Sequence, residues 1–350
     1  MLIDERVRKK GFEGVAVVRM VDPNARRIVE LMPYGLTVLD VTTPDRDGTP
    51  TQVVLGYDSL EDYKKDRSYQ GRGAVGRVAN RIGNAQFVGV DGQVVRLVGN
   101  DGPDNRNQLH GGPKGWSSRN HRYIGAENKG DKIITSWELI SPDGEQGFPG
   151  MVNLTSLVSL SEDGSLTFEY SANTTKPTPI NTTMHSYWNL NGSRSKTDVL
   201  NHMVQSNAVK YVKVDGQLIP VGALPNVAGT RYDFVSEVQL GLPWRFGEQG
   251  YDNCLVFPVS SKQGLVMVRS PDTGITLDVI TDRPSTQLYT GFFLDGKPAG
   301  RFGALCVEPG QLVDAVNHPE WETKGYGPRL VTPKEGFHSA MTYRLGQCKR

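Results

Sequence analysis

The chain has 350 residues, and its 39 lysines and arginines nearly balance its 38 aspartates and glutamates, which leaves a formal net charge of +1. This balance excludes the strongly basic surface of nucleic-acid-binding proteins, and no stretch approaches the roughly 18 consecutive apolar residues of a membrane-spanning helix, so we expect no nucleic-acid or membrane partner. Three scattered cysteines and an N-terminus without an apolar leader indicate free thiols in a reducing compartment, and we expect a cytoplasmic protein.

Short alternating segments dominate the chain, and long helical periodicity is absent. The stretch at residues 59–66 could form a short helix with Ser59 as its cap. Three segments alternate apolar and polar side chains with a period of two: residues 152–160, 166–170 and 275–279. Asp-Gly and Asn-Gly pairs between such segments favour tight hairpins. The pattern predicts a large antiparallel β-sandwich or barrel-like fold, and the even composition predicts one domain over residues 1–350.

Five short stretches are more polar than turns require: residues 76–85, 107–112, 181–192, 251–253 and 305–310. Taken singly, most of their side chains have a structural explanation. Arg77 and Arg81 could be solvated surface charges. His110 could belong to a turn, and Asp252 could cap a loop. Glu308 is harder to explain in this way because it ends the apolar run A-L-C-V.

His185 lies in the segment N-T-T-M-H-S-Y-W-N-L, whose β-branched and aromatic residues predict a buried strand. A titratable ring in a core needs partners for its nitrogens. His185 is therefore either a structural histidine with satisfied hydrogen bonds or a residue that lines a polar cleft.

A metal, a nucleotide and a cysteine nucleophile are each disfavoured by spacing. His110, His185, Asp252 and Glu308 are ligand types, but each lies on its own segment, whereas common zinc patterns place at least two ligands on one short element. No Gly-x-Gly-x-x-Gly follows a predicted strand. Cys306 lies in the apolar run and is interpreted as a core residue. We expect no metal and no cofactor.

A mixture of hydrogen-bonding and aromatic side chains remains, and it suits a sugar. The polar members are Asn80, Arg81, His110, His185, Asp252, Gln287 and Glu308. The aromatic members are Tyr187, Trp188, Tyr251, Tyr289 and Phe292. Aromatic faces can cover the C–H surface of a pyranose while the polar groups bind its hydroxyls, and one carboxylate with one imidazole can supply base and acid near neutral pH.

These motifs resemble those of the aldose 1-epimerases (galactose mutarotases), in the family's order and from about residue 14 to residue 345. The motifs are G-R-V-A-N-R-I (76–82), L-H-G-G (109–112), N-T-T-M-H-S-Y-W-N-L (181–190), Y-D-N (251–253), Q-L-Y-T-G (287–291) and E-P followed by D-A-V-N-H-P (308–319). The resemblance implies an all-β fold, a large antiparallel β-supersandwich with few short helices. It implies cofactor-free interconversion of the α and β anomers of free hexoses such as galactose and glucose.

The same resemblance implies roles for individual residues. Glu308 is expected to be the general base that takes the proton of the anomeric hydroxyl, and His185 the general acid that protonates the ring oxygen. The residues expected to hold sugar hydroxyls are Asn80, Arg81, His110, Asp252 and Gln287. A monosaccharide is the expected partner, and the protein is expected to be a monomer or a weak homodimer.

The chain departs from the family pattern at Phe292, Gly310, Val313 and His121, which puts the substrate preference in doubt. Two other functions stay open. A carbohydrate-binding or sensor protein would keep the cleft without turnover, but it would not need an acid facing a base. An epimerase of hexose 6-phosphates would need extra cations around the cleft, for which Arg77, Arg81 and Arg301 are candidates.

Overall fold

The computed structural model describes residues 1–65, 73–242, 250–261 and 263–348. Antiparallel strands make up most of this part of the chain, which confirms the predicted all-β class. The largest sheet, hereafter the large sheet, has the order β11 (Arg122–Asn128), β12 (Lys132–Ser141), β13 (Val152–Ser161), β14 (Ser165–Thr174), β24 (Phe337–Gln347), β21 (Ile275–Thr281), β20 (Gly264–Arg269), β16 (Met203–Ser206) and β18 (Val238–Gln239). The predicted alternating segments at 152–160, 166–170 and 275–279 all fall in its strands β13, β14 and β21.

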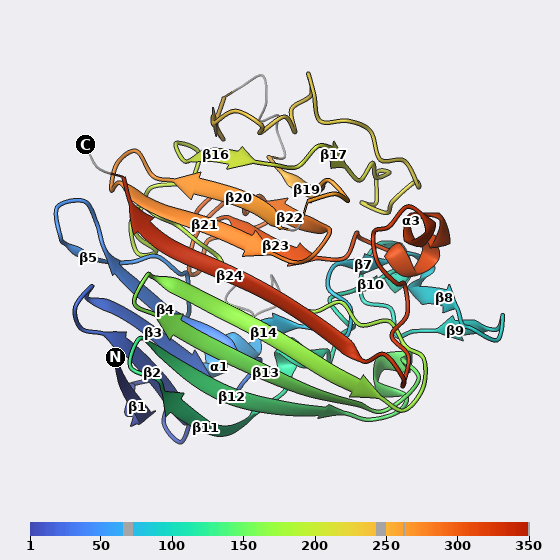
Figure 1. Ribbon diagram of the computed structural model, residues 1–350, viewed down its shortest axis with the longest axis horizontal. Helices are drawn as coiled ribbons and strands as arrows, with labels where there is room; N and C mark the ends of the chain where they lie inside the picture. The colour runs from blue at the N-terminus through green and yellow to red at the C-terminus, as the bar shows by residue number, and fades with distance from the viewer. Residues whose placement is uncertain (66–72, 243–249, 262, 349–350) are drawn as a thin grey trace.

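Further sheets pack against the large sheet. The N-terminal sheet contains β1 (Leu2–Val7), β2 (Val17–Asp22), β3 (Arg27–Met32), β4 (Thr37–Pro44) and β5 (Pro50–Gln52) in that order. The site sheet has the order β17 (Lys210–Tyr211), β19 (Asp252–Val256), β22 (Ser285–Tyr289) and β23 (Cys306–Gly310). One hydrophobic cluster joins all three sheets through residues such as Val18, Leu154, Leu277, Leu288 and Val307, so the main core lies between the layers of a sandwich (Figure 1).

Strand β24 lies in the middle of the large sheet although it comes after all the others in the chain (Figure 1). It pairs with β14 on one side and with β21 on the other. It therefore connects the β11–β14 part of the sheet to the part that contains β21, β20, β16 and β18.

Helices are short. The α-helices of the described residues are α1 (Leu60–Lys65) and α3 (Pro319–Thr323), and the 3₁₀ turns are η1 (Gly83–Ala85), η2 (Pro103–Asn105), η3 (Trp116–Ser118), η4 (Glu145–Gly147) and η5 (Ala315–Asn317). The backbone N–H of Asp62 donates to the hydroxyl of Ser59 at 3.2 Å, which confirms the predicted cap; Asp66 lies outside the described residues. Within the part of the chain that the structure covers, no helix is long and apolar enough to cross a membrane.

Among the described residues, three short two-stranded ladders lie outside these sheets. β6 (Ala74–Val75) pairs with β15 (Thr183–Met184), β7 (Arg81–Ile82) pairs with β10 (Gln108–Leu109), and β8 (Gln86–Val88) pairs with β9 (Val94–Arg96). The first two ladders bring three of the polar sequence motifs side by side.

Candidate active site

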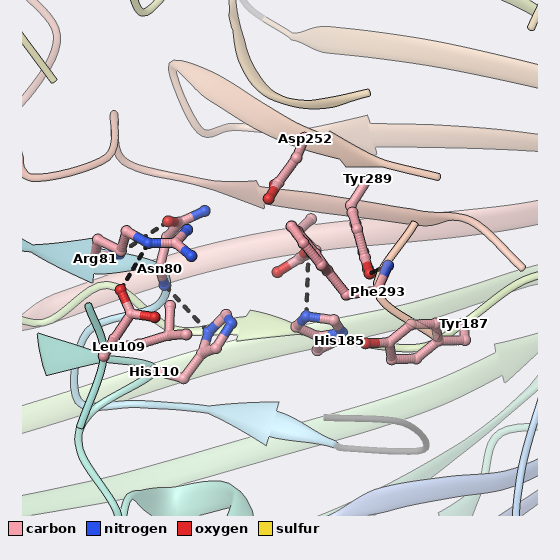
Figure 2. Close-up of a pocket in the computed structure, with 11 residues that line it drawn as sticks. Asn80, Arg81, Leu109, His110, His185, Tyr187, Asp252, Tyr289 and Phe293 are labelled. Carbon is pink, nitrogen blue, oxygen red and sulfur yellow. Dashed lines mark hydrogen bonds and ion pairs between the residues drawn. The ribbon is translucent and has the colours of Figure 1, made fainter. Parts of the chain in front are cut away.

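A cavity of about 310 Å³ opens between the site sheet and the short ladders (Figure 2). Its lining residues are Asn80, Arg81, Asp101, Leu109, His110, His185, Tyr187, Asp252, Tyr289, Phe293 and Glu308. This volume is at the lower end of the range for small-molecule sites and suits a ligand of monosaccharide size. The lining includes every predicted site residue except Gln287.

The cavity brings His185 and Glu308 together from segments far apart in the sequence. His185 follows β15, and Glu308 is the central residue of β23. Trp188 and Leu305 form an antiparallel bridge with backbone hydrogen bonds of 2.7 and 2.8 Å, which aligns the two segments. His185 Nε2 lies 3.5 Å from Glu308 Oε1, and both side chains are almost fully buried. A strand therefore carries the Glu308 carboxyl, and a bridged segment places the His185 imidazole beside it.

A residue of β24 contacts both segments from inside the core. The Tyr343 hydroxyl lies 3.2 Å from the carbonyl oxygen of Met184 and 2.9 Å from that of Val307, to which it donates. These carbonyls belong to the residues directly before His185 and Glu308. Tyr343 is thus placed between the segments that carry His185 and Glu308.

Burial and a second carboxylate together raise the pKa of Glu308. The side chain is removed from water, which disfavours its charged form, and Asp252 adds like-charge repulsion. Burial also raises the pKa of Asp252, whereas Arg81 and a hydrogen bond from Gln287 act in the opposite direction. A carboxylate with a raised pKa is a stronger base, which suits proton abstraction near neutral pH.

Gln287 supports the site from outside the cavity lining. The register of β19, β22 and β23 places Gln287 between Cys254 and Glu308 on the neighbouring strands. Its Nε2 donates to Asp252 Oδ1 at 2.6 Å. The structure therefore places Gln287 where it orients Asp252.

The β7–β10 ladder positions Asn80, Arg81 and His110. The backbone N–H of Asn80 donates to His110 Nδ1 at 3.2 Å, so a neutral His110 carries its proton on Nε2. Arg81 Nε lies 2.9 Å from Asp101 Oδ2, and both side chains are largely buried. This arrangement provides hydrogen-bond donors and acceptors along one wall of the cavity.

Arg77 anchors this wall, and the interpretation of Arg77 as a solvated surface charge is wrong. Its guanidinium is buried and donates to the Ser141 hydroxyl at 2.8 Å and to the carbonyl oxygens of Pro142 at 2.8 Å and Pro149 at 2.9 Å. The wall also needs glycine at Gly111, where φ is +78° and an added Cβ would lie 1.9 Å from the carbonyl oxygen of Gly76. Arg77 and Gly111, from the motifs at 76–82 and 109–112, therefore stabilise the backbone of this wall.

Not all the expected aromatic residues face the cavity. Tyr187 and Tyr289 line it, but Trp188 and Tyr251 belong to the main core, where Trp188 stacks on Tyr343. Phe292 packs under Arg301 and does not line the cavity. The neighbouring Phe293 does, and sequence reasoning missed it together with Asp101 and Leu109.

The departures from the family pattern lie away from the cavity lining. Gly310 ends β23 against the side chain of Asn181, and Val313 packs in a second hydrophobic cluster with Trp321. His121 is buried, which lowers its pKa to about 4 because the charged ring would lose its hydration. None of these side chains reaches the lining, so they give no reason for an altered sugar contact.

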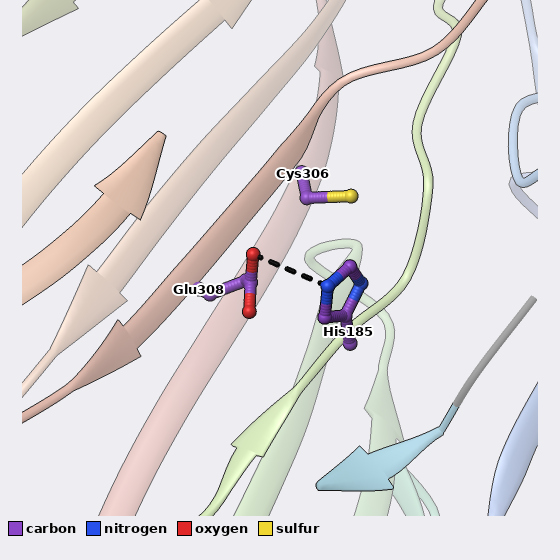
Figure 3. Close-up of side chains that lie close together, drawn as sticks. All are labelled: His185, Cys306 and Glu308. Atoms are coloured by element: carbon purple, nitrogen blue, oxygen red, sulfur yellow. Dashed lines mark ion pairs between the residues drawn. The ribbon is translucent and has the colours of Figure 1, made fainter. Parts of the chain in front are cut away.

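One group of metal-ligand types occurs among the described residues: His185, Cys306 and Glu308. Their ligand atoms lie within 4.8 Å of one another (Figure 3). Cys306 is fully buried and packs in an apolar cluster with Leu55 and Tyr289, as expected for a core residue. The sequence analysis does not predict this group because it interprets Cys306, two residues before Glu308 on β23, as a core residue, and because His185 lies on a distant segment.

Comparisons with known proteins agree with this geometry. The family model described as aldose 1-epimerase matches residues 17–328. An aldose 1-epimerase from Escherichia coli is 36% identical over 335 residues, which covers 92% of this chain and 93% of that protein. A human galactose mutarotase is 35% identical, covering 91% of this chain and 90% of that protein.

Solved structures of related proteins share the fold of this chain. The structure of an aldose epimerase homologue from C. elegans superposes with a TM-score of 0.83 at 26% identity, covering 96% of this chain and 99% of that one. A galactose 1-epimerase from Lactobacillus acidophilus has the same fold, with a TM-score of 0.82 at 22% identity and 99% of both chains covered. With its matching motifs gathered around one cavity, this chain belongs to the aldose 1-epimerase family.

Proposed function

We propose that the protein interconverts the α and β anomers of free hexoses such as galactose and glucose, with Glu308 as general base and His185 as general acid. The observation that carries this proposal is the buried pair itself, in which Nε2 and Oε1 lie 3.5 Å apart in the lining of a cavity of monosaccharide size. The family relationship supports an isomerase that opens and recloses a sugar ring.

The reaction is a balanced proton exchange. Glu308 takes the proton of the anomeric hydroxyl, the bond between C1 and the ring oxygen breaks, and His185 donates a proton to that oxygen. The open aldehyde rotates about the C1–C2 bond. Return of both protons along the same paths recloses the ring on the other face and restores the acid and the base.

Substrate positioning is proposed for Asn80, Arg81, His110 and Asp252, which line the cavity around the pair. Gln287 would act through Asp252, whose carboxylate it orients. Tyr187 and Tyr289 offer aromatic surface to the C–H faces of a pyranose. Holding the sugar in one orientation converts acid–base chemistry that is slow in water into a reaction between prepositioned groups.

The 6-phosphate alternative is weakened by the positions of its candidate cations. The buried guanidinium of Arg77 donates hydrogen bonds to the neighbouring turn. The guanidinium carbon of Arg301 lies 3.9 Å from the ring centroid of Phe292. Arg81 is the one of the three that lines the cavity, and Asp101 neutralises it. None of these three arginines therefore places an unneutralised positive charge in the cavity, where a phosphate dianion would need one.

Polarimetry on freshly dissolved α-galactose tests the acid–base pair. Glu308→Gln keeps the shape of the side chain but removes the base, and His185→Asn removes the proton donor. Each substitution should slow anomer exchange by roughly 10²–10⁴-fold with a modest effect on sugar affinity. Chelator treatment of the wild type should leave turnover intact.

Two outcomes would contradict the proposal. Wild-type turnover in folded Glu308→Gln would show that Glu308 is not the general base of the reaction. Loss of turnover in chelator, with recovery on adding a divalent ion, would show that metal-free acid–base chemistry is insufficient.

We further propose that residues 1–350 act as a single domain, that the protein works in the cytoplasm, and that it is a monomer or a weak homodimer. One hydrophobic cluster that extends from β2 to β24 supports the single domain. Light scattering at several protein concentrations tests the oligomeric state.

A further inference from the structure

The His185–Cys306–Glu308 cluster combines nitrogen, sulfur and oxygen ligands at one end of the cavity (Figure 3). His185 and Glu308 line the cavity, and the thiol of Cys306 lies beside them on the inner side. Mutarotation as proposed gives this thiol no role. We propose that His185, Cys306 and Glu308 bind a single zinc ion that excludes sugar from the catalytic pair and so inhibits the enzyme.

The distances suit a tetrahedral zinc site after a small adjustment. Bond lengths of about 2.0–2.3 Å to N, O and S place ligand atoms about 3.3–3.7 Å apart. The Nε2–Oε1 distance of 3.5 Å already falls in this range. The widest separation in the cluster is at most 4.8 Å, so the remaining ligand needs to approach by only about 1 Å.

The ligand chemistry favours zinc over the hard cations. Magnesium and calcium prefer all-oxygen sites, whereas imidazole and thiolate select borderline-soft metals. Binding replaces the thiol proton of Cys306, which is released to the buffer, so the ion faces a thiolate and a carboxylate whose charges balance its own. The fourth position faces the cavity, from which the ion would enter.

The surrounding charges also favour a cation. Asp252 lines the same cavity as Glu308 and places a second carboxylate on the side from which the ion would enter. Arg81, the cation of the opposite wall, is paired with Asp101. A dication beside Glu308 would therefore relieve the repulsion between the two cavity carboxylates.

Zinc would inhibit the enzyme because it would bind the same atoms of Glu308 and His185 that transfer protons in the proposed reaction. The ion would take the oxygen of Glu308 that abstracts a proton and the imidazole nitrogen that donates one. It would also occupy the space where the anomeric centre must lie. Zinc and sugar should therefore compete; this part of the inference rests on the proposed mutarotation, whereas zinc binding itself does not.

Zinc binding can be measured without sugar, by competition with a chromophoric chelator. All proteins carry Cys348→Ser, which removes the partly exposed thiol. Cys306→Ala removes the proposed soft ligand, and Cys254→Ala is the matched control because Cys254 is equally buried in a neighbouring part of the site sheet but outside the cluster. We expect one zinc ion per chain in the parent and in Cys254→Ala, and an affinity weaker by about tenfold or more in Cys306→Ala.

Cobalt provides a second readout, since a thiolate-to-cobalt charge-transfer band should be present in the parent and absent in Cys306→Ala. If Cys306→Ala does not fold, as judged by circular dichroism, Cys306→Ser keeps the side-chain size and should show the same loss. Equal zinc affinity in all folded variants, or no binding up to millimolar zinc, would overturn the proposal.

Polarimetry then tests inhibition. Zinc should raise the apparent KM for galactose in the parent, and Cys306→Ala should keep its zinc-free turnover but need about tenfold or more zinc for the same inhibition. Full turnover in the zinc-saturated parent would overturn the inhibitory role. A protein that binds zinc through Cys306 but never turns over sugar would instead contradict the proposed function alone.

Discussion

At the scale of single residues, Asp252 has two effects in the cavity. It places a carboxylate in the lining, where we propose that it binds the sugar, and its charge raises the pKa of Glu308. These effects can be separated, because binding changes the height of a pH–rate profile whereas the pKa of the base changes the position of its acidic limb.

Asp252→Asn should therefore lower kcat/KM and move the acidic limb to lower pH. Removing the negative charge makes ionisation of Glu308 easier, so the base stays ionised at more acidic pH. Mutarotation rates measured across the acidic range provide the test, with Asp104→Asn, an exposed carboxylate outside the cavity lining, as the control. An unchanged limb in Asp252→Asn would show that Glu308 does not sense this charge.

Most of the cavity residues could be predicted from the sequence, because Asn80, Arg81, His110, His185, Asp252 and Glu308 belong to recognisable motifs and all line the cavity. Asp101 could not, since it occupies an Asp-Gly pair that a turn explains fully. Trp188 could not be assigned to the core, because the predicted strand ends at Met184 in the structure and the sequence does not show which side chains of the following bridged segment point inward. The metal-ligand cluster could not be predicted either, because a bridge between segments distant in the sequence brings its members together.

At the scale of elements, the Tyr343 hydroxyl of β24 contacts both the His185 segment and the Glu308 segment. Tyr343→Phe would remove the hydroxyl that donates to the Val307 carbonyl and lies beside that of Met184. We expect unfolding free energy to fall by about 1–3 kcal/mol. We also expect kcat to fall several-fold, because the alignment of His185 with Glu308 would loosen.

Tyr170→Phe is the matched control. Tyr170 is equally buried on the neighbouring strand β14, but its hydroxyl has no hydrogen-bond partner among the described residues. Its removal should leave stability and kcat almost unchanged or slightly raise stability. Denaturant unfolding and polarimetry on both variants decide the matter, and identical behaviour would exclude the positioning role of Tyr343.

The local sequence pattern predicts where strands lie along the chain, but it does not predict the order in which they pair in the sheet. The period of two located segments within β13, β14 and β21 because it depends only on neighbouring residues. The pairing of β14 with β24 joins strands separated by almost half of the chain, and neither strand carries a local signal for it.

At the scale of the whole molecule, buried neutral histidines make stability depend on pH. Burial lowers the pKa of His202 to about 3. The ring fits the neutral form, because Nε2 accepts the Leu190 N–H at 3.0 Å while Nδ1 lies 3.1 Å from Asn201 Oδ1. In the unfolded chain a histidine has a pKa of about 6.5, so acidification below that value protonates the unfolded state first.

His202 should therefore favour the folded state fully at pH 7, and this stabilisation should be lost as the pH falls through about 6.5 towards 3. At pH 5 the loss of unfolding free energy should be about 2 kcal/mol. Buried carboxyls act in the opposite direction; burial raises the pKa of Asp314 to about 6, for example. A comparison of variants isolates the histidine. His202→Gln should reduce the difference in unfolding free energy between pH 7 and pH 5 by about 2 kcal/mol, and an unchanged difference would contradict the assignment.

The central position of β24 also has a consequence for the order of events in folding. The β11–β14 part of the large sheet can form by local hairpins, but its junction with β21 requires β24 to close a long loop, which is an entropically slow step. Because Tyr343 on that strand contacts the segments of both His185 and Glu308, we expect a partly folded chain to have nearly complete strands and still have no working site. Recovery of sugar turnover thus reports closure of the sheet at β24, while the strand signal in circular dichroism reports earlier steps.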